Sequence, residues 1–314
     1  MPNPGRQLVK PPALRPGDTI GIVAPASNVK QADLEAGCAA LRQAGYKTFY
    51  LDSILDRDLY FAGTAARRLR ELEEMFEREE VRAILCARGG YGANYLLRDL
   101  DWKKIASHPK IFIGYSDITC LLTQLVDSGL VTFHGPMSAK DWAHADGVNL
   151  ESWIAALTQT AAWAVPINDG VVALGEGEAE GRLYGGCLSI LVASLGTDYE
   201  IQTDETILFM EDIGAKPYQI DRMLMQLKLA GKLENVRGLI FGEMIDCIQA
   251  ANQDYTLQEV IMRIVGELNI PVAYGLKSGH VTSNNITLPL GVKAKLQVEK
   301  ENVGIKILES AVTA

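Results

Sequence analysis

Short apolar runs alternate with helix-like segments through the first half of the chain. In residues 65–76, for example, apolar side chains recur at helical spacing, with Arg and Glu on the other face. The expected strands are the apolar runs at 19–24, 48–51, 81–87, 111–113 and 131–134. Nearly continuous apolar strands with helices between them are typical of a parallel sheet covered on both faces. We therefore predict a doubly wound, flavodoxin- or Rossmann-like α/β domain over residues 1–160.

The second half has a different pattern. Apolar runs at 206–210 and 236–241 predict strands, and residues 217–229 and 257–268 predict helices. Residues 286–290 and 294–298 flank Gly291 with the alternation of an antiparallel hairpin. Residues 158–180 are rich in Ala, Gly and acidic residues and are expected to be irregular. These patterns predict a linker at 161–179 and a smaller C-terminal α+β domain with a curved sheet at 180–314.

Composition and charge exclude several classes of partner. The net charge of −9 argues against binding of a nucleic-acid backbone, which needs clustered cations. The proline-rich stretch from Met1 to Gly17 lacks the apolar core of a signal peptide, and no later run is long enough to span a membrane. The five cysteines are scattered without CxxC pairing, which favours neither disulfides nor a metal site. We expect a cytoplasmic protein with no nucleic-acid or membrane partner.

The tetrad Gly114-Tyr115-Ser116-Asp117 carries the first chemical signal. It ends the apolar run at 111–113 and opens a helix-like segment at 118–130. A serine on a sharp strand-to-helix turn can stand clear of the sheet beside backbone N–H groups, as in a nucleophile elbow. Only the first elbow glycine is present, because Ile118 occupies the second position. The alternative is that Ser116 or Asp117 simply caps the helix.

A glycine-rich segment, Arg88-Gly89-Gly90-Tyr91-Gly92, follows the expected strand at 81–87. Ligands of doubly wound sheets bind outside the carboxyl ends of the strands, which places this segment near Ser116. Its glycines let the backbone approach a ligand and direct N–H groups at an anion. It could be a plain turn or help to build an oxyanion hole; a P-loop is disfavoured because no Lys-Ser/Thr pair follows.

A serine nucleophile needs a base and a carboxylate that orients it. The chain has four histidines: His108, His134, His144 and His280. His134 ends a strand of the first domain and could reach the same rim, whereas His280 lies in a small-residue loop that a second domain could present across a cleft. Glu211 and Asp212 follow the strand at 206–210. Their alternative role is to cap the 217–229 helix or to pair with Arg222.

Together these blocks resemble the LD-carboxypeptidase family of serine peptidases, which includes muramoyl-tetrapeptide carboxypeptidases and microcin C immunity proteins. The resemblance runs from about residue 14 to 308 in one order. It rests on the following blocks: Arg88 to Gly92, Gly114 to Asp117, His134-Gly135-Pro136, Gly181-x-x-x-Gly185-Gly186, Met210-Glu211-Asp212, Pro217-Tyr218 with Asp221-Arg222, and Gly279-His280. One departure is Cys187, where the family tends to have Asn.

The resemblance implies a catalytic triad of Ser116, Glu211 and His280, with an oxyanion hole from the amides of Asp117 and Gly90. It implies release of a terminal D-Ala from cytoplasmic murein tetrapeptide through an acyl-enzyme, without metal or other cofactor, by a homodimer. The substrate's free carboxylate calls for a cationic pocket, for which Arg88 and Lys216 are candidates. Tyr91 and His134 are further candidate substrate contacts.

Two other functions remain open at this point. A hydrolase like the microcin C immunity proteins would cleave the amide between an aminoacyl group and a nucleotide. Alternatively, a non-catalytic module would bind an anion or nucleotide at the glycine loop, with Ser116 as a helix cap. The sequence does not distinguish diaminopimelate from lysine before the scissile bond.

Overall fold

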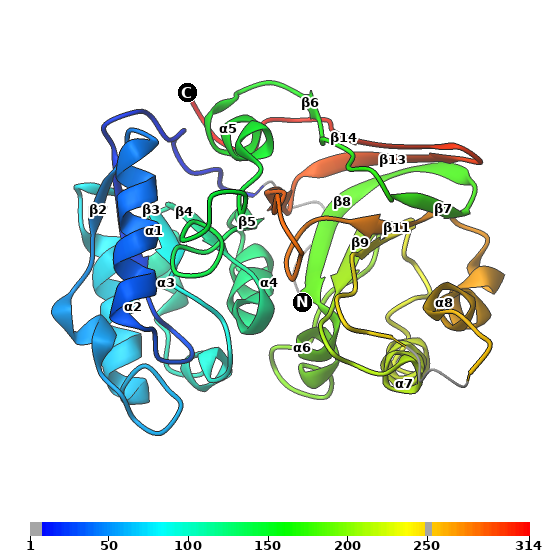
Figure 1. Cartoon of the computed structure of the whole chain (residues 1–314), viewed down its shortest axis with the longest axis horizontal. Coiled ribbons are helices and arrows are strands. Elements are labelled where there is room, and N and C mark those ends of the chain that lie inside the picture. Colours follow the sequence, from blue (N-terminus) through cyan, green and yellow to red (C-terminus); the bar gives the residue numbers. More distant parts are fainter. Residues whose placement is uncertain (1–7, 249–252) are drawn as a thin grey trace.

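Two β-sheets lie side by side, each with its own helices, in the computed structural model of this chain (Figure 1). The structure describes residues 8–248 and 253–314. The first sheet has six strands in the order β12-β5-β4-β3-β1-β2. Its five parallel strands are β1 (Thr19–Val23), β2 (Lys47–Phe49), β3 (Val81–Cys86), β4 (Ile111–Gly114) and β5 (Thr132–His134). The predicted doubly wound parallel sheet is therefore confirmed.

The helices between these strands also follow the predicted alternation. Thr64 caps α2, because its side chain accepts a hydrogen bond from the Arg67 backbone N–H. The helices of this part are α1 (Gln31–Gln43), α2 (Ala65–Glu77), α3 (Trp102–Ala106), α4 (Thr119–Asp127) and α5 (Leu150–Thr158). Short 3₁₀ turns are η1 (Asp52–Leu55), η2 (Ala93–Leu96) and η3 (Ser116–Ile118).

The second sheet is mixed and has eight strands, in the order β6-β14-β13-β8-β9-β10-β11-β7. Strands β8 to β11 run parallel to one another, and the remaining pairings are antiparallel. The strands are β6 (Trp163–Ala164), β7 (Val172–Gly175), β8 (Gly177–Cys187), β9 (Thr206–Glu211), β10 (Gly238–Gly242), β11 (Val272–Leu276), β13 (Lys293–Glu299) and β14 (Asn302–Ile307). The helices are α6 (Leu188–Ala193), α7 (Pro217–Leu229), α8 (Leu257–Val265) and the turn η4 (Gly266–Leu268).

Two expectations about the second half are wrong. The hairpin of 286–290 with 294–298 does not form, because β12 (Leu288–Leu290) pairs with β5 of the first sheet. Strand β13 pairs instead with β8 and β14. Pro289 fits the outer position of β12, where a strand needs fewer backbone donors. The stretch expected to be irregular, 158–180, contributes β6, β7 and the start of β8.

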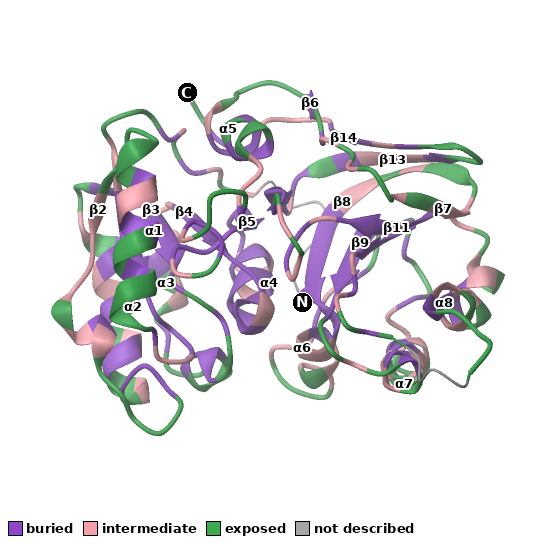
Figure 2. Ribbon diagram, in the orientation of Figure 1, coloured by how far each residue is buried: buried purple, intermediate pink, exposed green. Residues whose placement is uncertain are grey.

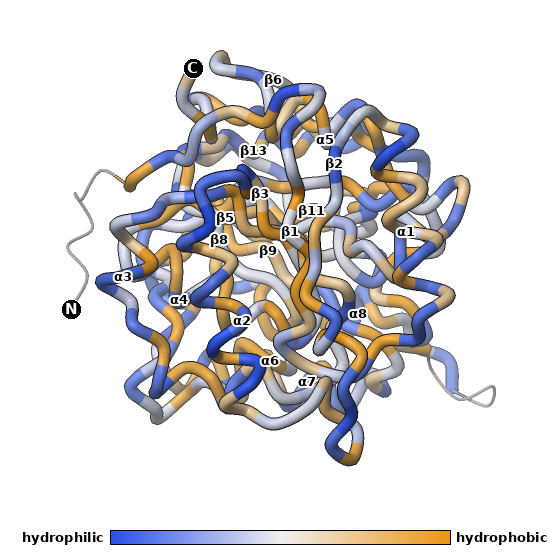
Figure 3. The backbone as a smooth tube through the Cα atoms, turned by 90° about the vertical axis from the view of Figure 1, so that its left-hand side faces the viewer, coloured by the Kyte–Doolittle hydropathy of each residue, from blue (hydrophilic) through white to orange (hydrophobic). Residues whose placement is uncertain are grey.

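Each sheet with its own helices forms one unit, which we call the first and the second unit. Buried strands form the centre of both units, and exposed residues gather on helices and loops (Figure 2). Figure 3 shows the same separation as hydrophobic stretches along the central strands. The two units meet where the end of β8 packs on the start of α4. An added Cβ at Gly186 would lie 2.6 Å from Thr119 Oγ1, so this approach requires glycine. In the described ranges, no helix is both long and apolar enough to cross a membrane.

Candidate active site

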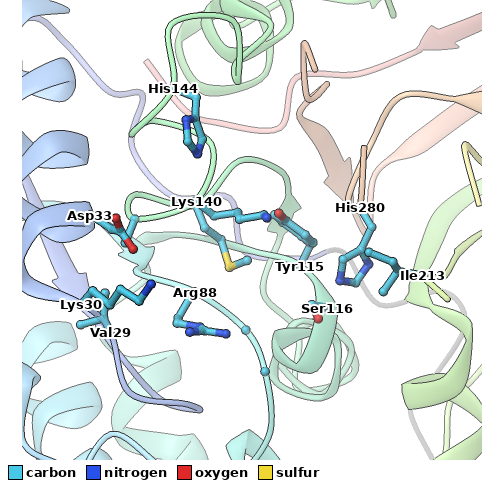
Figure 4. A pocket seen from close by; sticks show the side chains of 14 residues that line it. Val29, Lys30, Asp33, Arg88, Tyr115, Ser116, Lys140, His144, Ile213 and His280 are labelled. Carbon is cyan, nitrogen blue, oxygen red and sulfur yellow. The ribbon is translucent and has the colours of Figure 1, made fainter. Parts of the chain in front are cut away.

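A pocket of about 510 Å³ lies at the carboxyl ends of the first sheet's strands (Figure 4). The loops after β1, β3, β4 and β5 all line it, as expected for a parallel sheet. Ile213 and His280 complete the wall from the second unit. The lining residues are Val29, Lys30, Asp33, Arg88, Gly89, Gly90, Tyr115, Ser116, Met137, Ala139, Lys140, His144, Ile213 and His280.

Ser116 occupies a strained turn between β4 and α4. Its φ angle is +64°, a left-handed conformation that non-glycine residues seldom adopt and that clusters at functional sites. The capping alternative is not supported, because Ile118 is the N-cap of α4 and no side chain caps that helix. Ser116 is therefore held in a costly conformation that exposes it to the pocket, as an elbow would hold a nucleophile.

The glycine loop after β3 lies directly against this serine. A Cβ added to Gly89 would come within 2.7 Å of Ser116 Cβ, 3.0 Å of its Oγ and 3.3 Å of the Asp117 backbone nitrogen. Gly90, whose φ is +107°, instead faces Ser27. Both glycines line the pocket. The loop and the serine turn therefore bring backbone groups of two strand ends together around one hydroxyl.

The side chain of Asp117 fastens the glycine loop to the serine turn. Its Oδ2 accepts a hydrogen bond from the Ala93 backbone N–H at 2.7 Å. Burial raises the pKa of this carboxyl to about 6, although hydrogen bonds to backbone amides and the charge of Arg68 oppose the shift. Asp117 thus has a structural role through its side chain, and its backbone amide remains next to Ser116.

Glu211 and His280 form a hydrogen-bonded pair at the edge of the pocket. Glu211 is the last residue of β9 and is fully buried. Its Oε2 accepts hydrogen bonds from His280 Nδ1 at 2.8 Å and from the His280 backbone N–H at 2.9 Å. Asp212 points elsewhere and accepts from the backbone of Ser189 and Ile213. Lys216 is the N-cap of α7, and neither Glu211 nor Asp212 forms an ion pair with Arg222 among the described residues, so both structural alternatives fail.

The environment of His280 favours the charged imidazole. Burial alone would lower its pKa, but the charge of Glu211 and the hydrogen bond to it outweigh burial and raise the pKa above 6.5. The Tyr115 ring stands edge-on to the imidazole, with ring centres 5.2 Å apart. Both His280 and Ser116 line the pocket, and Figure 4 draws them on the side away from Lys30.

The loop that carries His280 is held by a buried amide. Asn285 Oδ1 accepts from the Gly279 backbone N–H at 3.0 Å, and its Nδ2 donates to the Gly279 carbonyl at 3.0 Å. The same Nδ2 donates to Asp141 Oδ1 at 3.2 Å. Asp141 belongs to the segment after β5, so Asn285 ties the His280 loop to the first unit.

His134 is fully buried and does not line the pocket. Ser278 Oγ donates its only proton to the Ile286 carbonyl, so the Nδ1–H of His134 donates to Ser278 Oγ at 3.0 Å. Its Nε2 then carries a lone pair, 3.9 Å from Glu211 Oε1. Burial first, and then the charge of His280, lower the pKa of His134 to about 3. His134 is therefore a neutral core histidine.

The candidate substrate contacts divide into two groups. Arg88 lines the pocket, whereas Tyr91, His134 and Lys216 are not among its lining residues. Tyr91 is exposed and packs in an aromatic group with Tyr60, Phe61 and Tyr95.

Sequence reasoning missed Lys30 and Lys140, which line the pocket together with Arg88. Lys30 lies in the loop after β1, and Lys140 lies in the loop after β5. The rule that ligands bind at carboxyl ends of parallel strands would have found them. The three cations make the pocket suitable for an anionic ligand (Figure 4).

Comparison with known proteins identifies the family. Residues 20–135 match the N-terminal domain of LD-carboxypeptidases, and residues 180–296 match the C-terminal domain. A probable murein peptide carboxypeptidase of Bacillus subtilis is 38% identical over 95% of this chain and 94% of its own length. The crystal structure of muramoyltetrapeptide carboxypeptidase from Oxalobacter formigenes is 30% identical, with a TM-score of 0.83, covering 94% of this chain and all of that chain (100%).

A second branch of relatives is similar in fold. The structure of MccF in complex with glutamyl sulfamoyl guanosine is 27% identical, with a TM-score of 0.90, over 97% of this chain and 99% of that one. The matches to both family domains and the similarity to these relatives point to the same family. The chain belongs to the LD-carboxypeptidase family of serine-type peptidases.

Proposed function

We propose that this protein is a serine carboxypeptidase that hydrolyses the L,D-peptide bond before the terminal D-Ala of a murein tetrapeptide. The observation that carries the proposal is the Glu211–His280 hydrogen bond beside a strained, pocket-facing Ser116. The relatives named as murein carboxypeptidases support the choice of substrate.

The proposed reaction uses the three side chains as a unit. His280 takes the proton of Ser116 as the serine oxygen attacks the scissile carbonyl, and Glu211 holds the imidazole and stabilises its charged form. The amides of Asp117 and Gly90 stabilise the tetrahedral oxyanion, an effect of about 3–4 kcal/mol for a single donor. Collapse transfers a proton from His280 to the leaving amine and releases D-Ala. Water, activated by His280, then hydrolyses the ester on Ser116.

The pocket cations fit the carboxylate of the terminal residue. Arg88 can bind a carboxylate through two parallel N–H donors, and Lys30 and Lys140, which also line the pocket, add point charges. Asp33 is the acidic residue among the lining side chains and could meet an ammonium group of the peptide. This arrangement favours a short peptide with a free C-terminus over an internal peptide bond.

The experiment is an assay for D-Ala released from tetrapeptides that end in diaminopimelyl-D-Ala or L-Lys-D-Ala. Release should survive EDTA and should be abolished in Ser116→Ala. The two peptides also show which third residue is preferred. Absence of release from both peptides, together with cleavage of an aminoacyl-sulfamoyl adenylate, would overturn the proposal in favour of an immunity-type hydrolase. Anion binding without any hydrolysis would favour the non-catalytic alternative.

We further propose that the protein acts in the cytoplasm as a homodimer, on peptides recovered from the cell wall. Sedimentation equilibrium tests the dimer, which predicts twice the chain mass of 34.2 kDa. A concentration-independent monomer would contradict it.

A further inference from the structure

Cys187 stands beside the proposed triad, although the mechanism does not use it. It ends β8 and is in register with Glu211, which ends the neighbouring strand β9. Ligand atoms of Cys187, Glu211 and His280 all lie within 4.8 Å of one another. A thiol, a carboxylate and an imidazole therefore converge from two strand ends and one loop.

These three donors match the ligands that Zn²⁺ prefers. Zinc binds thiolate sulfur, imidazole nitrogen and carboxylate oxygen at roughly 2.0–2.3 Å, so ligand atoms around one ion lie roughly 3.5 Å apart. Small side-chain movements would bring the present cluster to that spacing. A thiolate and a carboxylate would also neutralise the charge of a divalent ion in a site where Cys187 is 4% exposed and Glu211 is 0% exposed.

Glu211 supplies a second, independent indication of unused binding capacity. Its Oε1 is buried and has no hydrogen-bond partner among the described residues, while Oε2 carries both bonds to His280. A buried carboxylate oxygen without a donor leaves a lone pair available to a cation. His280 lines the pocket, so an ion can reach the cluster from that side.

We propose that Cys187, Glu211 and His280 form an inhibitory site for Zn²⁺. The ion replaces the thiol proton of Cys187 and takes a ring nitrogen of His280. Coordination of Nδ1 moves the proton that Nδ1 donates to Glu211 onto Nε2, which then has no lone pair for the serine proton, and coordination of Nε2 uses that lone pair directly. Either way the base is lost. The thiol proton is released to solvent. Mg²⁺ and Ca²⁺ prefer oxygen ligands and do not bind this cluster.

Metal binding is tested without reference to activity. Titration of the metal-free protein with Co²⁺ should produce a thiolate-to-cobalt charge-transfer band, and calorimetry should show one Zn²⁺ per chain. Cys187→Ser, which nearly keeps the size of the side chain, should lose the band and lower the affinity for Zn²⁺ by at least about tenfold. Even the loss of a group that only hydrogen-bonds to a metal ligand has an effect of that size. Cys38→Ser, a buried thiol of α1, is the matched control and should bind as the wild type does.

Inhibition is the second arm, and it alone rests on the proposed function. Zn²⁺ should inhibit D-Ala release, and EDTA should restore it. For each protein, inhibition is expressed relative to its own rate without metal. On this scale Cys187→Ser should need at least about tenfold more Zn²⁺ than the wild type for the same inhibition. Absence of the cobalt band, or equal zinc affinity in the two serine variants, would overturn the site. If no D-Ala is released at all, the proposed function fails while the binding arm still decides the metal site.

Discussion

At the scale of single residues, the contact between Gly89 and Ser116 controls the position of the proposed nucleophile. An alanine methyl group at 89 would meet the serine side chain at 2.7 Å and the Asp117 nitrogen at 3.3 Å. We predict that Gly89→Ala lowers kcat by about 100-fold, because displacement of a catalytic group by about 1 Å has an effect of that order. D-Ala release measures the loss, and circular dichroism checks the fold.

Gly304→Ala is the control for this change. No atom lies within 4 Å of the added Cβ, and the backbone of Gly304 is not in the left-handed region. Its turnover should match the wild type. Unchanged turnover in Gly89→Ala would show that the loop does not position Ser116.

Glu211 controls the protonation of His280, which gives a second prediction at this scale. The raised pKa of His280 places the acidic limb of the kcat/KM profile above pH 6.5, because the protonated imidazole cannot act as a base. Glu211→Gln removes the charge that raises this pKa, so the limb should move to lower pH while the plateau falls. A pH–rate profile of both proteins is the measurement. An acidic limb that stays in place in Glu211→Gln would contradict the assigned pair.

At the scale of elements, the loop between β11 and β12 presents His280 because Asn285 closes it. Asn285→Ala leaves the buried N–H and carbonyl of Gly279 without this partner and removes one donor from Asp141, which should lower the free energy of unfolding by about 1–3 kcal/mol and reduce kcat. Urea denaturation and D-Ala release measure the two effects. Asn284→Gly, at an exposed neighbour with φ of +53°, should change neither. Equal effects of the two variants would exclude a closing role for Asn285.

Sequence patterns predicted some elements better than others, for physical reasons. Helix α7 begins and ends where its proline and apolar spacing indicate, at Pro217 and Leu229. The sequence of β8 shows little strand pattern, because it contains Gly181 and Gly185. Glycine is needed at both positions, since an added Cβ would meet the carbonyl oxygens of Glu205 and Phe209. Strand β12 was assigned to the wrong partner, because alternation fixes the face of a strand but not the sheet it joins.

At the scale of the whole molecule, residues of both units form the pocket. The first sheet and its loops were predictable from alternating apolar runs, and the serine and glycine loops were correctly placed at its carboxyl edge. The pairing of Glu211 with His280 came from the family resemblance, because residues 69 positions apart carry no local signal of contact. The same limit applies to Asn285, whose partner Asp141 is 144 positions away.

His134 lies at the junction of the two units and links global stability to pH. It ends β5, bonds to Ser278 of the His280 loop and packs against Phe209 of β9. Because its pKa falls from 6.5 to about 3 on folding, the unfolded chain binds a proton in this window that the folded protein does not. Its contribution is intact above pH 6.5 and is lost as the pH falls toward 3, by up to about 1.4 kcal/mol per pH unit.

Three carboxyls oppose this trend, because desolvation raises their pKa values to about 6: the buried Asp117 and Asp141 and the partly buried Asp127. The test therefore compares the wild type with a variant that lacks His134, so that the contributions of these carboxyls cancel. The stability of wild type minus that of His134→Gln, from urea denaturation between pH 5 and pH 7, should decrease on acidification. The exposed His108→Gln serves as control. A difference that does not change with pH would mean that folding does not lower the pKa of His134.

The central claim is that Ser116 and His280 act as one catalytic unit, and the most direct measurement is kcat for D-Ala release by Ser116→Ala, His280→Ala and the double variant. We predict that each single change lowers kcat by on the order of 10⁴-fold or more, and that the double variant is hardly slower, because triad members are not additive. Near-normal turnover by His280→Ala, or losses that multiply in the double variant, would contradict it.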